Sequence, residues 1–279
     1  MIAKNLEVEF RPELSNYDYH LNTTHDSHSA LQQFRKSPLR YYHQRITKRI
    51  PPKKRSPEMR LGSVLHTAIL EPAEFDRLVL VIPEEVLSKS GAKSGKSWES
   101  FEWEHRDKIL LKQAEYDDIR WQVDSVNEHP TARKILDDCT SFEQSVFVDD
   151  GKHKRKCRFD AVAEVSAAYH DLKRTSCESE DEFWRNVQKF GFHRQAAHYS
   201  DLFEAAYGSR PLARWIIVLD EAPFETYVRR VPKAAIELGR IENAETLRAI
   251  SKARETGNWH REGAHDDRDL YIPDFFYPG

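Results

Sequence analysis

The sequence predicts an α/β fold in which helical regions precede, separate and follow a group of β-strands. Two alternating runs joined at Asp150-Gly151 (residues 145–165) are typical of a β-hairpin, because Asp-Gly is a strong turn signal. The continuous apolar run RWIIVL (residues 214–219) is typical of a buried strand. Stretches with helical periodicity surround these strands, so the chain combines both kinds of element in one sequence.

The first half of the chain is predicted to be mainly helical. Residues 1–26 are expected to form an irregular polar arm, followed by a helix that starts at Ser27 and bends at Pro38. Residues 59–72 predict a helix whose apolar side chains form one stripe. These side chains are Leu61, Val64, Leu65, Ala68 and Ile69. After a Gly/Ser/Lys loop, a long charged helical region is expected to end near residue 137.

The second half alternates strands and helices. HDLKRT (residues 170–175) predicts a short strand after the hairpin, and residues 181–208 predict a helix with an irregularity at Gly191. An edge-like strand is expected at residues 225–231. A last helix is predicted over residues 232–257, where proline stands near the start and glycine at the end.

Composition limits the class of protein. The chain has 279 residues, of which 39% are hydrophobic and 32% charged, which is ordinary for a globular protein with a polar surface. The first ten residues are too polar for a signal peptide. The aliphatic run LVLVI (residues 78–82) has the length of a strand and cannot span a bilayer. We therefore expect a cytoplasmic protein that is not embedded in a membrane.

Charge and cysteine content further limit the kinds of binding site that the chain can have. The net charge is -3, so any binding of nucleic acid must come from local basic patches such as residues 48–55 and 152–158. The chain has 3 scattered cysteines, which argues against a disulfide framework. They also cannot supply four thiolates for an iron–sulfur cluster.

The stretch RFDAVAEVSAAYHDLKRT (residues 158–175) carries the pattern most relevant to function. Alternate residues of a strand share a face, so Asp171 and Lys173 project together. If this strand pairs with the preceding one, Asp160 can approach Asp171. Two adjacent carboxylates favour a shared divalent cation such as Mg²⁺, and a nearby ammonium can orient an attacking water. These are the components of metal-assisted phosphodiester hydrolysis.

The sequence allows other interpretations of the Asp/Lys pattern, and it contains two further candidate sites. Aspartate and lysine on a strand often form only a solvated face or a weak surface ion pair. The glycine-rich loop GAKSGKS (residues 91–97) lacks the spacing of a phosphate-binding loop. A zinc site at His25 and His28, or at His193 and His198, has no suitably spaced thiolates to support it.

Three further features favour the nuclease interpretation. His66 lies beside the apolar stripe of its predicted helix rather than on the outer face. Gln195 and Tyr199 are four residues apart and share a helix face. Lys156 and Arg158 share the face of the carboxylate that follows them, so we expect them to contact a phosphate backbone.

In this order, His66, FDAV, DLK and QAAHY resemble the motifs of the RecB-like branch of the PD-(D/E)XK nucleases. The resemblance covers roughly residues 27–220, and GSVLH, LEPAEF and GFHRQAAHY extend it beyond the catalytic positions. It is greatest for RecE-type (exonuclease VIII) nuclease domains and more distant for lambda exonuclease. One departure is Arg174, where relatives commonly have threonine.

The resemblance implies a restriction-endonuclease-like core with a central mixed sheet flanked by helices. It also implies an Mg²⁺-dependent exodeoxyribonuclease, with Mn²⁺ as a substitute, that degrades linear double-stranded DNA from 5′ to 3′. Such an enzyme leaves 3′ single-stranded tails for recombination. Relatives form homo-oligomeric rings around DNA, and a single-strand annealing recombinase is the partner expected by analogy. A phage or prophage origin in a bacterial host is expected on the same basis.

The resemblance also implies roles for particular residues. The expected metal ligands are His66, Asp160, Asp171 and the carbonyl of Leu172. Lys173 is expected to serve the nucleophilic water, and Gln195 and Tyr199 to support the site and contact DNA. Glu143, before the hairpin, stands where relatives often carry a glutamate, and we expect it to have only a minor role.

We expect a single nuclease domain over residues 1–279. Its predicted parts are an N-terminal arm (1–26), a mainly helical part (27–141), a catalytic core (142–257) and a C-terminal tail (258–279). Two alternatives remain. One is a DNA-binding or assembly module that kept the fold without catalysis. The other is a structure- or sequence-specific endonuclease on the same fold.

Overall fold

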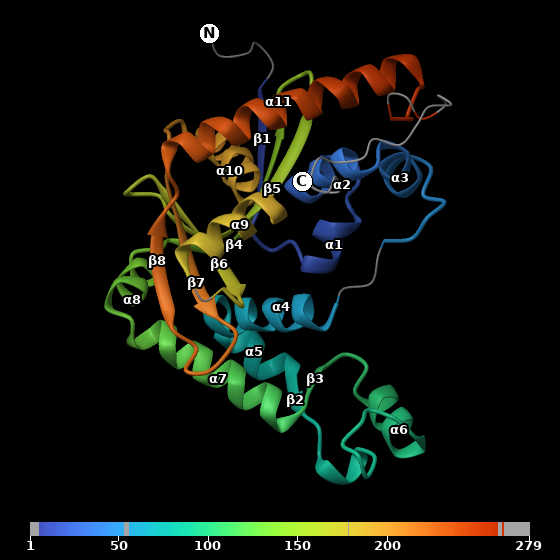
Figure 1. Ribbon diagram of the computed structural model, residues 1–279, viewed down its shortest axis with the longest axis vertical. Coiled ribbons are helices and arrows are strands. Elements are labelled where there is room, and N and C mark those ends of the chain that lie inside the picture. The colour runs from blue at the N-terminus through green and yellow to red at the C-terminus, as the bar shows by residue number, and fades with distance from the viewer. Residues whose placement is uncertain (1–5, 53–55, 178, 262–263, 265–279) are drawn as a thin grey trace, which may run out of the picture.

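A mixed β-sheet lies at the centre of the molecule, and helices cover both of its faces (Figure 1). The computed structural model describes residues 6–52, 56–177, 179–261 and 264. Within them, six strands form a sheet in the order β1-β4-β5-β6-β7-β8. The pair β6–β7 is parallel and the other pairs are antiparallel. The predicted fold class is therefore confirmed.

The main sheet follows the predicted order of strands, with one addition at the N-terminus. Its strands are β1 (Glu7–Arg11), β4 (Ser141–Asp149), β5 (Lys154–Ala163), β6 (Ala168–Thr175), β7 (Leu212–Leu219) and β8 (Thr226–Arg230). The hairpin β4–β5 closes with Asp149 opposite Lys154, as the Asp-Gly turn predicts. A second, two-stranded parallel sheet consists of β2 (Val79–Val81) and β3 (Ile109–Leu111).

The helices fall into two groups along the chain. Those before the hairpin are α1 (Asn16–Leu21), α2 (His28–Lys36), α3 (Pro38–Tyr41), the π-helical turn η1 (Tyr42–Ile46), α4 (Pro57–Leu70), α5 (Pro72–Leu78), the 3₁₀ turn η2 (Glu84–Val86), α6 (Lys96–Glu104), α7 (Gln113–Glu128) and α8 (Pro130–Asp137). Those after it are α9 (Glu180–Phe190), α10 (Phe192–Tyr207) and α11 (Lys233–Thr256). The predicted breaks at Pro38 and Gly191 both occur.

Each face of the sheet has its own hydrophobic core. On one face, Phe159, Tyr169 and Trp215 pack with side chains of α9 and α10. On the other, Leu172 and Ile216 pack with side chains of α4, α7 and α8. Both faces of β7 are covered, and this explains why RWIIVL is a continuous apolar run. The two cores hold the ends of β5 and β6 in fixed positions between helices.

Helix α10 is held in place by a close approach to α11. Gly239 lies against the backbone of His193, and a Cβ atom at this glycine would stand 2.3 Å from the His193 carbonyl oxygen. A side chain of any size would therefore push the helices apart. The Asn243 amide also donates a hydrogen bond of 2.8 Å to the Arg194 carbonyl. These contacts fix the first turn of α10, where Gln195 lies.

The N-terminal arm differs from the prediction of an irregular segment. Residues 7–11 form the edge strand β1, paired antiparallel with β4, and residues 16–21 form the short helix α1. Tyr19 of α1 is buried against Phe147 of β4. The arm is thus part of the folded body. The sequence did not predict this strand and this helix, because only one face of an edge strand and of a short helix needs to be apolar.

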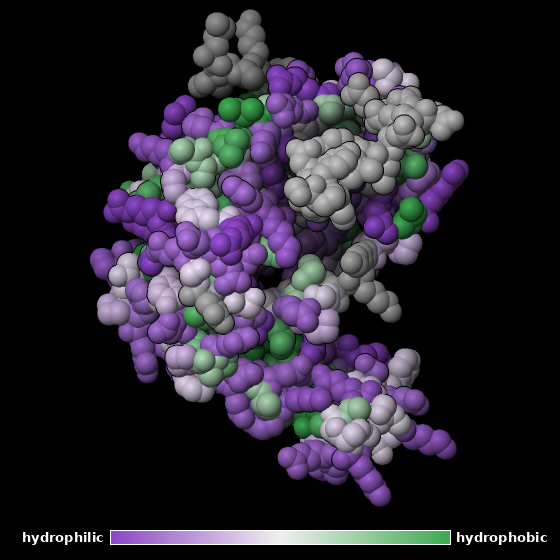
Figure 2. All heavy atoms as spheres, viewed as in Figure 1, coloured by the Kyte–Doolittle hydropathy of each residue, from purple (hydrophilic) through white to green (hydrophobic). Residues whose placement is uncertain are grey.

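The region after the second predicted helix also differs. The predicted long helical region is interrupted by β3, which pairs with β2. Together with α6 these strands form a lobe that projects from the body (Figures 1 and 2) and has a small core of its own. This core is built on Ile82, Trp98 and Leu110. A strand of three residues is too short to carry a clear alternation in the sequence.

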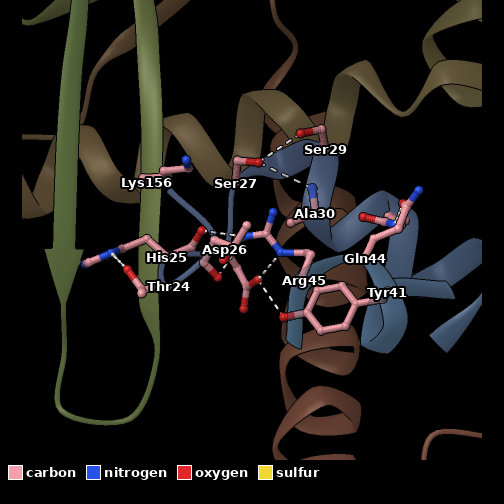
Figure 3. A network of polar contacts seen from close by, with 12 residues as sticks. Thr24, His25, Asp26, Ser27, Ser29, Ala30, Tyr41, Gln44, Arg45 and Lys156 are labelled. Carbon is pink, nitrogen blue, oxygen red and sulfur yellow. Dashed lines mark hydrogen bonds and ion pairs between the residues drawn. The ribbon is translucent and has the colours of Figure 1, made fainter. Parts of the chain in front are cut away.

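Asp26 connects the arm, the first helices and α11 to the sheet (Figure 3). Its backbone pairs with β5 across a short bridge, and its side chain is buried. The carboxylate accepts hydrogen bonds from the Tyr41 hydroxyl at 2.7 Å and from Arg254 at 3.1 Å, and it lies 3.4 Å from the Arg45 Nε. Burial of this charge is stabilised because two guanidinium groups and a hydroxyl surround it.

The surface in Figure 2 is mainly hydrophilic. No helix in the described part of the chain combines the length and the apolar character needed to cross a bilayer.

Candidate metal centre

The candidate site lies where β5 and β6 separate. The antiparallel ladder between them runs from Ala163↔Ala168 to Ala161↔His170 and stops before Asp160. In place of a strand partner, the side chain of Asp160 accepts the backbone N–H of Leu172 at 2.7 Å. We call this opening between the strands the fork. The hydrogen bond satisfies a buried backbone donor and fixes the carboxylate at the mouth of the fork.

Helix α4 brings His66 to the fork. The helix begins at the N-cap Ser56 and packs through Val64, Leu65 and Ala68, so His66 sits at the edge of the packed face with 28% of its side chain exposed. The ring Nε2 lies 3.1 Å from the Leu172 carbonyl oxygen. A carbonyl can only accept, so Nε2 carries the proton in this hydrogen bond. The other ring nitrogen, Nδ1, faces Asp160, whose Oδ2 is 3.6 Å away.

Glu143 of β4 completes a group of three potential ligands. Counting back from the hairpin turn, it stands opposite Asp160, between the pairs Phe142↔Ala161 and Gln144↔Phe159. Its Oε1 is 3.9 Å from the Nδ1 of His66. One ligand atom each from His66, Glu143 and Asp160 lies within 4.8 Å of the others. The sequence predicted only a minor role for Glu143, and the structure places its carboxylate among the potential ligands.

Asp171 and Lys173 lie on the other strand of the fork and interact with each other. The Asp171 carboxylate and the Lys173 ammonium form an ion pair through Oδ2. Gln195 of α10 bridges them, because its Oε1 accepts from Lys173 at 3.0 Å and its Nε2 donates to the Asp171 Oδ1 at 3.0 Å. Asp171 is therefore adjacent to the three-residue group without being part of it, since its oxygens face Lys173 and Gln195.

The electrostatics show that negative charge is crowded at the fork. Burial, with the charge of Asp160 adding to it, raises the pKa of Glu143 to about 8. Burial also raises the pKa of Asp171 to about 6, with Lys173 opposing and Asp160 reinforcing the shift. Carboxyl groups with raised pKa values resist ionisation, and here the neighbouring Lys173 and Arg158 do not fully offset burial and mutual repulsion. A cation among them relieves this cost.

The chemistry of the donors fits a divalent cation. Carboxylate and carbonyl oxygens are the ligands of Mg²⁺ and Mn²⁺, and an imidazole nitrogen suits transition metals such as Mn²⁺. The fork supplies carboxylates, the imidazole of His66 and the carbonyl of Leu172 within one small region. The binding of a metal by each predicted ligand stays a prediction.

Lys156 and Arg158 are not free to meet a phosphate in this structure, unlike the prediction. Lys156 is buried, and its amine donates to the carbonyls of Tyr19 and Asn22 under the N-terminal arm. Burial lowers its pKa to about 7. Arg158 is enclosed by the same arm. The predicted shared face with Asp160 is occupied by α1, so contact with DNA at these residues requires the arm to move, and it stays a prediction.

The remaining candidate residues fall into two sets. The ring of Tyr199 is partly buried against Phe159 and Tyr169, on the same helix as Gln195. Its predicted contact with DNA stays a prediction. Among the residues that the structure describes, neither histidine pair considered for zinc joins a group of three ligands. His198, for example, is buried with its Nε2 3.0 Å from the Lys156 carbonyl.

Sequence reasoning undervalued Glu143, although a signal was present. The Asp-Gly turn fixes the hairpin register, and this register places Glu143 opposite Asp160. It did not reveal that Glu143 adopts a backbone φ of 47°, outside the range of a regular strand. A positive φ costs free energy for a residue with a side chain, so it cannot be read from strand periodicity.

Comparisons with known proteins agree with this geometry. The profile of a family described as "PDDEXK-like domain of unknown function (DUF3799)" matches residues 27–265. Among solved structures, the chain is similar to a candidate exonuclease from Eubacterium rectale, with a TM-score of 0.65 and 13% sequence identity. The similarity covers 94% of this chain and 96% of that one, and at this identity it shows a shared fold. No curated protein sequence matches significantly.

Proposed function

The chain belongs to the family of PDDEXK-like domains of unknown function (DUF3799), and on this basis we propose that it is an exodeoxyribonuclease acting on linear double-stranded DNA. The predicted membership of the PD-(D/E)XK superfamily is confirmed. The finer assignment to RecE-type nucleases is part of the proposal. So are the 5′-to-3′ direction, the 3′ single-stranded products and the role in recombination, which rest on the resemblance in sequence motifs.

One observation carries the proposal. His66, Glu143 and Asp160 converge on one side of the fork, and the Asp171–Lys173 pair lies on the other side. The structural similarity to a candidate exonuclease supports the same activity for this chain. A solvated strand face does not explain the arrangement, because Asp160 and Asp171 are both buried. Buried carboxyl groups with raised pKa values are typical of functional sites.

We assign roles from the positions of these groups. Asp160 and Asp171 hold Mg²⁺, or Mn²⁺ in its place, with His66, Glu143 and the Leu172 carbonyl as further ligands. The bound cation supplies Lewis-acid stabilisation of negative charge on the phosphate. The ammonium of Lys173, held by Gln195, orients the attacking water and offsets charge on the phosphate. Gln195 and Tyr199 lie on one helix beside the site and support it.

Three wider features belong to the same proposal. We propose that the chain forms a single nuclease domain, because one hydrophobic core joins α4, α7 and α8 to strands β5, β6 and β7. A homo-oligomeric ring around DNA and a single-strand annealing recombinase as partner follow from the resemblance. An origin in a phage or prophage, with activity in the cytoplasm of the bacterial host, follows from it as well.

The direct test is digestion of DNA with defined ends. The purified protein is incubated with linear duplex DNA labelled at either the 5′ or the 3′ end, in Mg²⁺, in Mn²⁺ and in EDTA. We expect early release of the 5′ label in the presence of either cation, and no release in EDTA. The variant Asp160→Asn, which keeps the shape of the side chain, is expected to lose the activity.

Closed circular DNA separates the exonuclease from the alternatives. An end-dependent enzyme leaves it intact, whereas an endonuclease linearises it. Binding of duplex ends without cleavage in either cation supports the non-catalytic module instead. Activity that survives in EDTA contradicts the metal-dependent proposal altogether.

A further inference from the structure

Arg158 is fixed between the N-terminal arm and the candidate metal centre. Its Nε donates to the Ser145 hydroxyl at 2.8 Å, and one terminal nitrogen, Nη2, donates to the Leu14 carbonyl at 2.5 Å. The guanidinium carbon lies 4.7 Å from the centre of the Tyr19 ring. Only 11% of the side chain is exposed. A guanidinium with so many partners has a single orientation.

The other terminal nitrogen of Arg158 points to the metal centre. Nη1 lies 3.9 Å from the Oε2 of Glu143. The second oxygen of the same carboxylate, Oε1, faces His66. Glu143 therefore stands between a cation on one side and the ligand group on the other. Nη1 is the donor that the hydrogen bonds to Ser145 and Leu14 leave available.

The backbone of Glu143 requires such support. Its φ of 47° lies in the left-handed region, which residues with a side chain adopt only when their surroundings hold them there. The glutamate side chain is 20% exposed, so it has room to swing away from His66 and Asp160. The charge of Arg158 and its fixed geometry oppose that movement.

We propose that Arg158 is a positioning residue that keeps Glu143 in the ligand group, and that the N-terminal arm supports the metal centre through Arg158. The inference rests on the proposed metal-dependent function. It changes the expected role of Arg158 from binding phosphate to orienting a ligand. Arm residues 14–22 thereby contribute to a centre whose ligands come from other parts of the chain.

Lys156 provides a matched comparison. It lies two residues before Arg158 on the same face of β5 and donates to carbonyls of the same arm. Its amine is 4.2 Å from the centre of the Tyr19 ring, and among the described residues it forms no ion pair with a carboxylate. A change at Lys156 thus disturbs the arm without removing a contact to Glu143.

The test measures binding of Mn²⁺ to the protein without DNA, by isothermal titration calorimetry. Arg158→Gln and Glu143→Gln are each expected to weaken binding about 10-fold, as is common when a group that orients a ligand is lost. The double variant is expected to bind no more weakly than either single variant, because both changes remove the same ligand. Lys156→Met is expected to stay within about twofold of the parent protein.

Several results overturn the inference. If Arg158→Gln binds Mn²⁺ with the affinity of the parent protein, the positioning role is wrong. It is also wrong if the losses of Mn²⁺ affinity of the two single variants add up in the double variant. An equal loss in Lys156→Met assigns the effect to the arm as a whole. If Arg158→Gln does not fold, Ser145→Ala replaces it, since this change frees the Nε of Arg158 and is expected to weaken Mn²⁺ binding by a smaller factor. Parental binding in that variant is equally decisive.

Failure of the wider proposal is distinguishable. If the parent protein does not bind Mn²⁺, or Asp160→Asn binds it as well as the parent does, the metal-dependent function itself fails. If Asp160→Asn loses binding and Arg158→Gln keeps it, only the positioning role fails.

Discussion

The carboxylate of Asp160 accepts the backbone N–H of Leu172 at a distance of 2.7 Å, and this contact links the two strands where their ladder ends. It joins the residue that begins the fork to the residue whose carbonyl faces His66. Asp160 therefore has a structural role in addition to its proposed role as a metal ligand. One of its oxygens is fixed by a backbone donor, so the carboxylate can be oriented before any cation arrives.

Lys173 is predicted to be essential for the rate of DNA cleavage. Lys173→Met removes the ammonium beside the Asp171 carboxylate and is expected to lower the rate constant of the cleavage step at least about 100-fold, the scale of positioned proton-transfer groups. The measurement is single-turnover cleavage of labelled linear duplex at saturating Mg²⁺.

The control for this variant is stability, because Asp171 then lacks its buried partner. Circular dichroism must show a folded protein at the assay temperature. A folded Lys173→Met protein that cleaves at the parental rate contradicts the role assigned to this amine.

Gln195 is predicted to matter through the pair that it bridges. Gln195→Met keeps the size of the side chain but removes both 3.0 Å hydrogen bonds, to Lys173 and to Asp171. We expect cleavage to slow at least about 10-fold, since a single hydrogen bond to a charged group contributes about 1.5 kcal/mol or more. The matched variant is Gln188→Met on the exposed surface of α9, which should cleave normally. Equal rates for the two variants would argue against the bridging role.

The stability of the metal-free protein is predicted to depend on pH through Glu143. Its pKa in the folded protein is about 8, above the ordinary value of 4.5, so folding favours its protonated form. That stabilisation is complete below about pH 4.5 and is lost as the pH rises through 8. Glu143→Gln cannot ionise, so it should gain at least about 1 kcal/mol relative to the parent between pH 5 and pH 9.

Urea denaturation of the parent and of Glu143→Gln at several pH values, in EDTA, measures this difference. The difference between the two proteins removes the contribution of titrating groups that do not interact with Glu143. A constant difference across the range means that the pKa of Glu143 is not raised.

Affinity for the cation is predicted to increase with pH. The pKa values of Glu143 (about 8) and Asp171 (about 6) are raised, so both carboxyl groups must release protons before they can act as ligands. Binding of Mn²⁺ should strengthen from pH 6 to about pH 8 and level off above it. Titration calorimetry in two buffers of different ionisation enthalpy measures the protons released. No release of protons at pH 6.5 contradicts this prediction.

Tyr41 is predicted to contribute to stability through Asp26. Tyr41→Phe removes a 2.7 Å hydrogen bond to a buried carboxylate and is expected to cost about 1.5 to 3 kcal/mol. Tyr42→Phe is the control, because the neighbouring Tyr42 ring stacks on Trp259 and should tolerate the change within about 0.5 kcal/mol. Thermal unfolding of both variants measures the loss of stability caused by each substitution. Equal losses would contradict the role assigned to the Tyr41 hydroxyl, because both variants keep the aromatic ring.

Much of the fold was predictable because local patterns carried it. The Asp-Gly turn set the hairpin register, and the uninterrupted apolar run in β7 predicted a strand that is buried on both faces. Pro38 and Gly191 marked breaks through their own backbone restrictions. The strands in the N-terminal arm and in the projecting lobe were not predicted. Strands β1, β2 and β3 have five, three and three residues, which is too short for a reliable period.

By itself, the sequence determined which residues could take part in the chemistry and in what order they occur. The alternation of side chains along a strand put Asp171 and Lys173 on one face, and this is a property of the chain alone. Tertiary structure decided which groups meet. It set Glu143 beside His66 and Asp160, and it closed the arm over Lys156 and Arg158. The reason is physical. Periodicity fixes directions within one element, whereas a ligand group requires distances between elements that only packing sets.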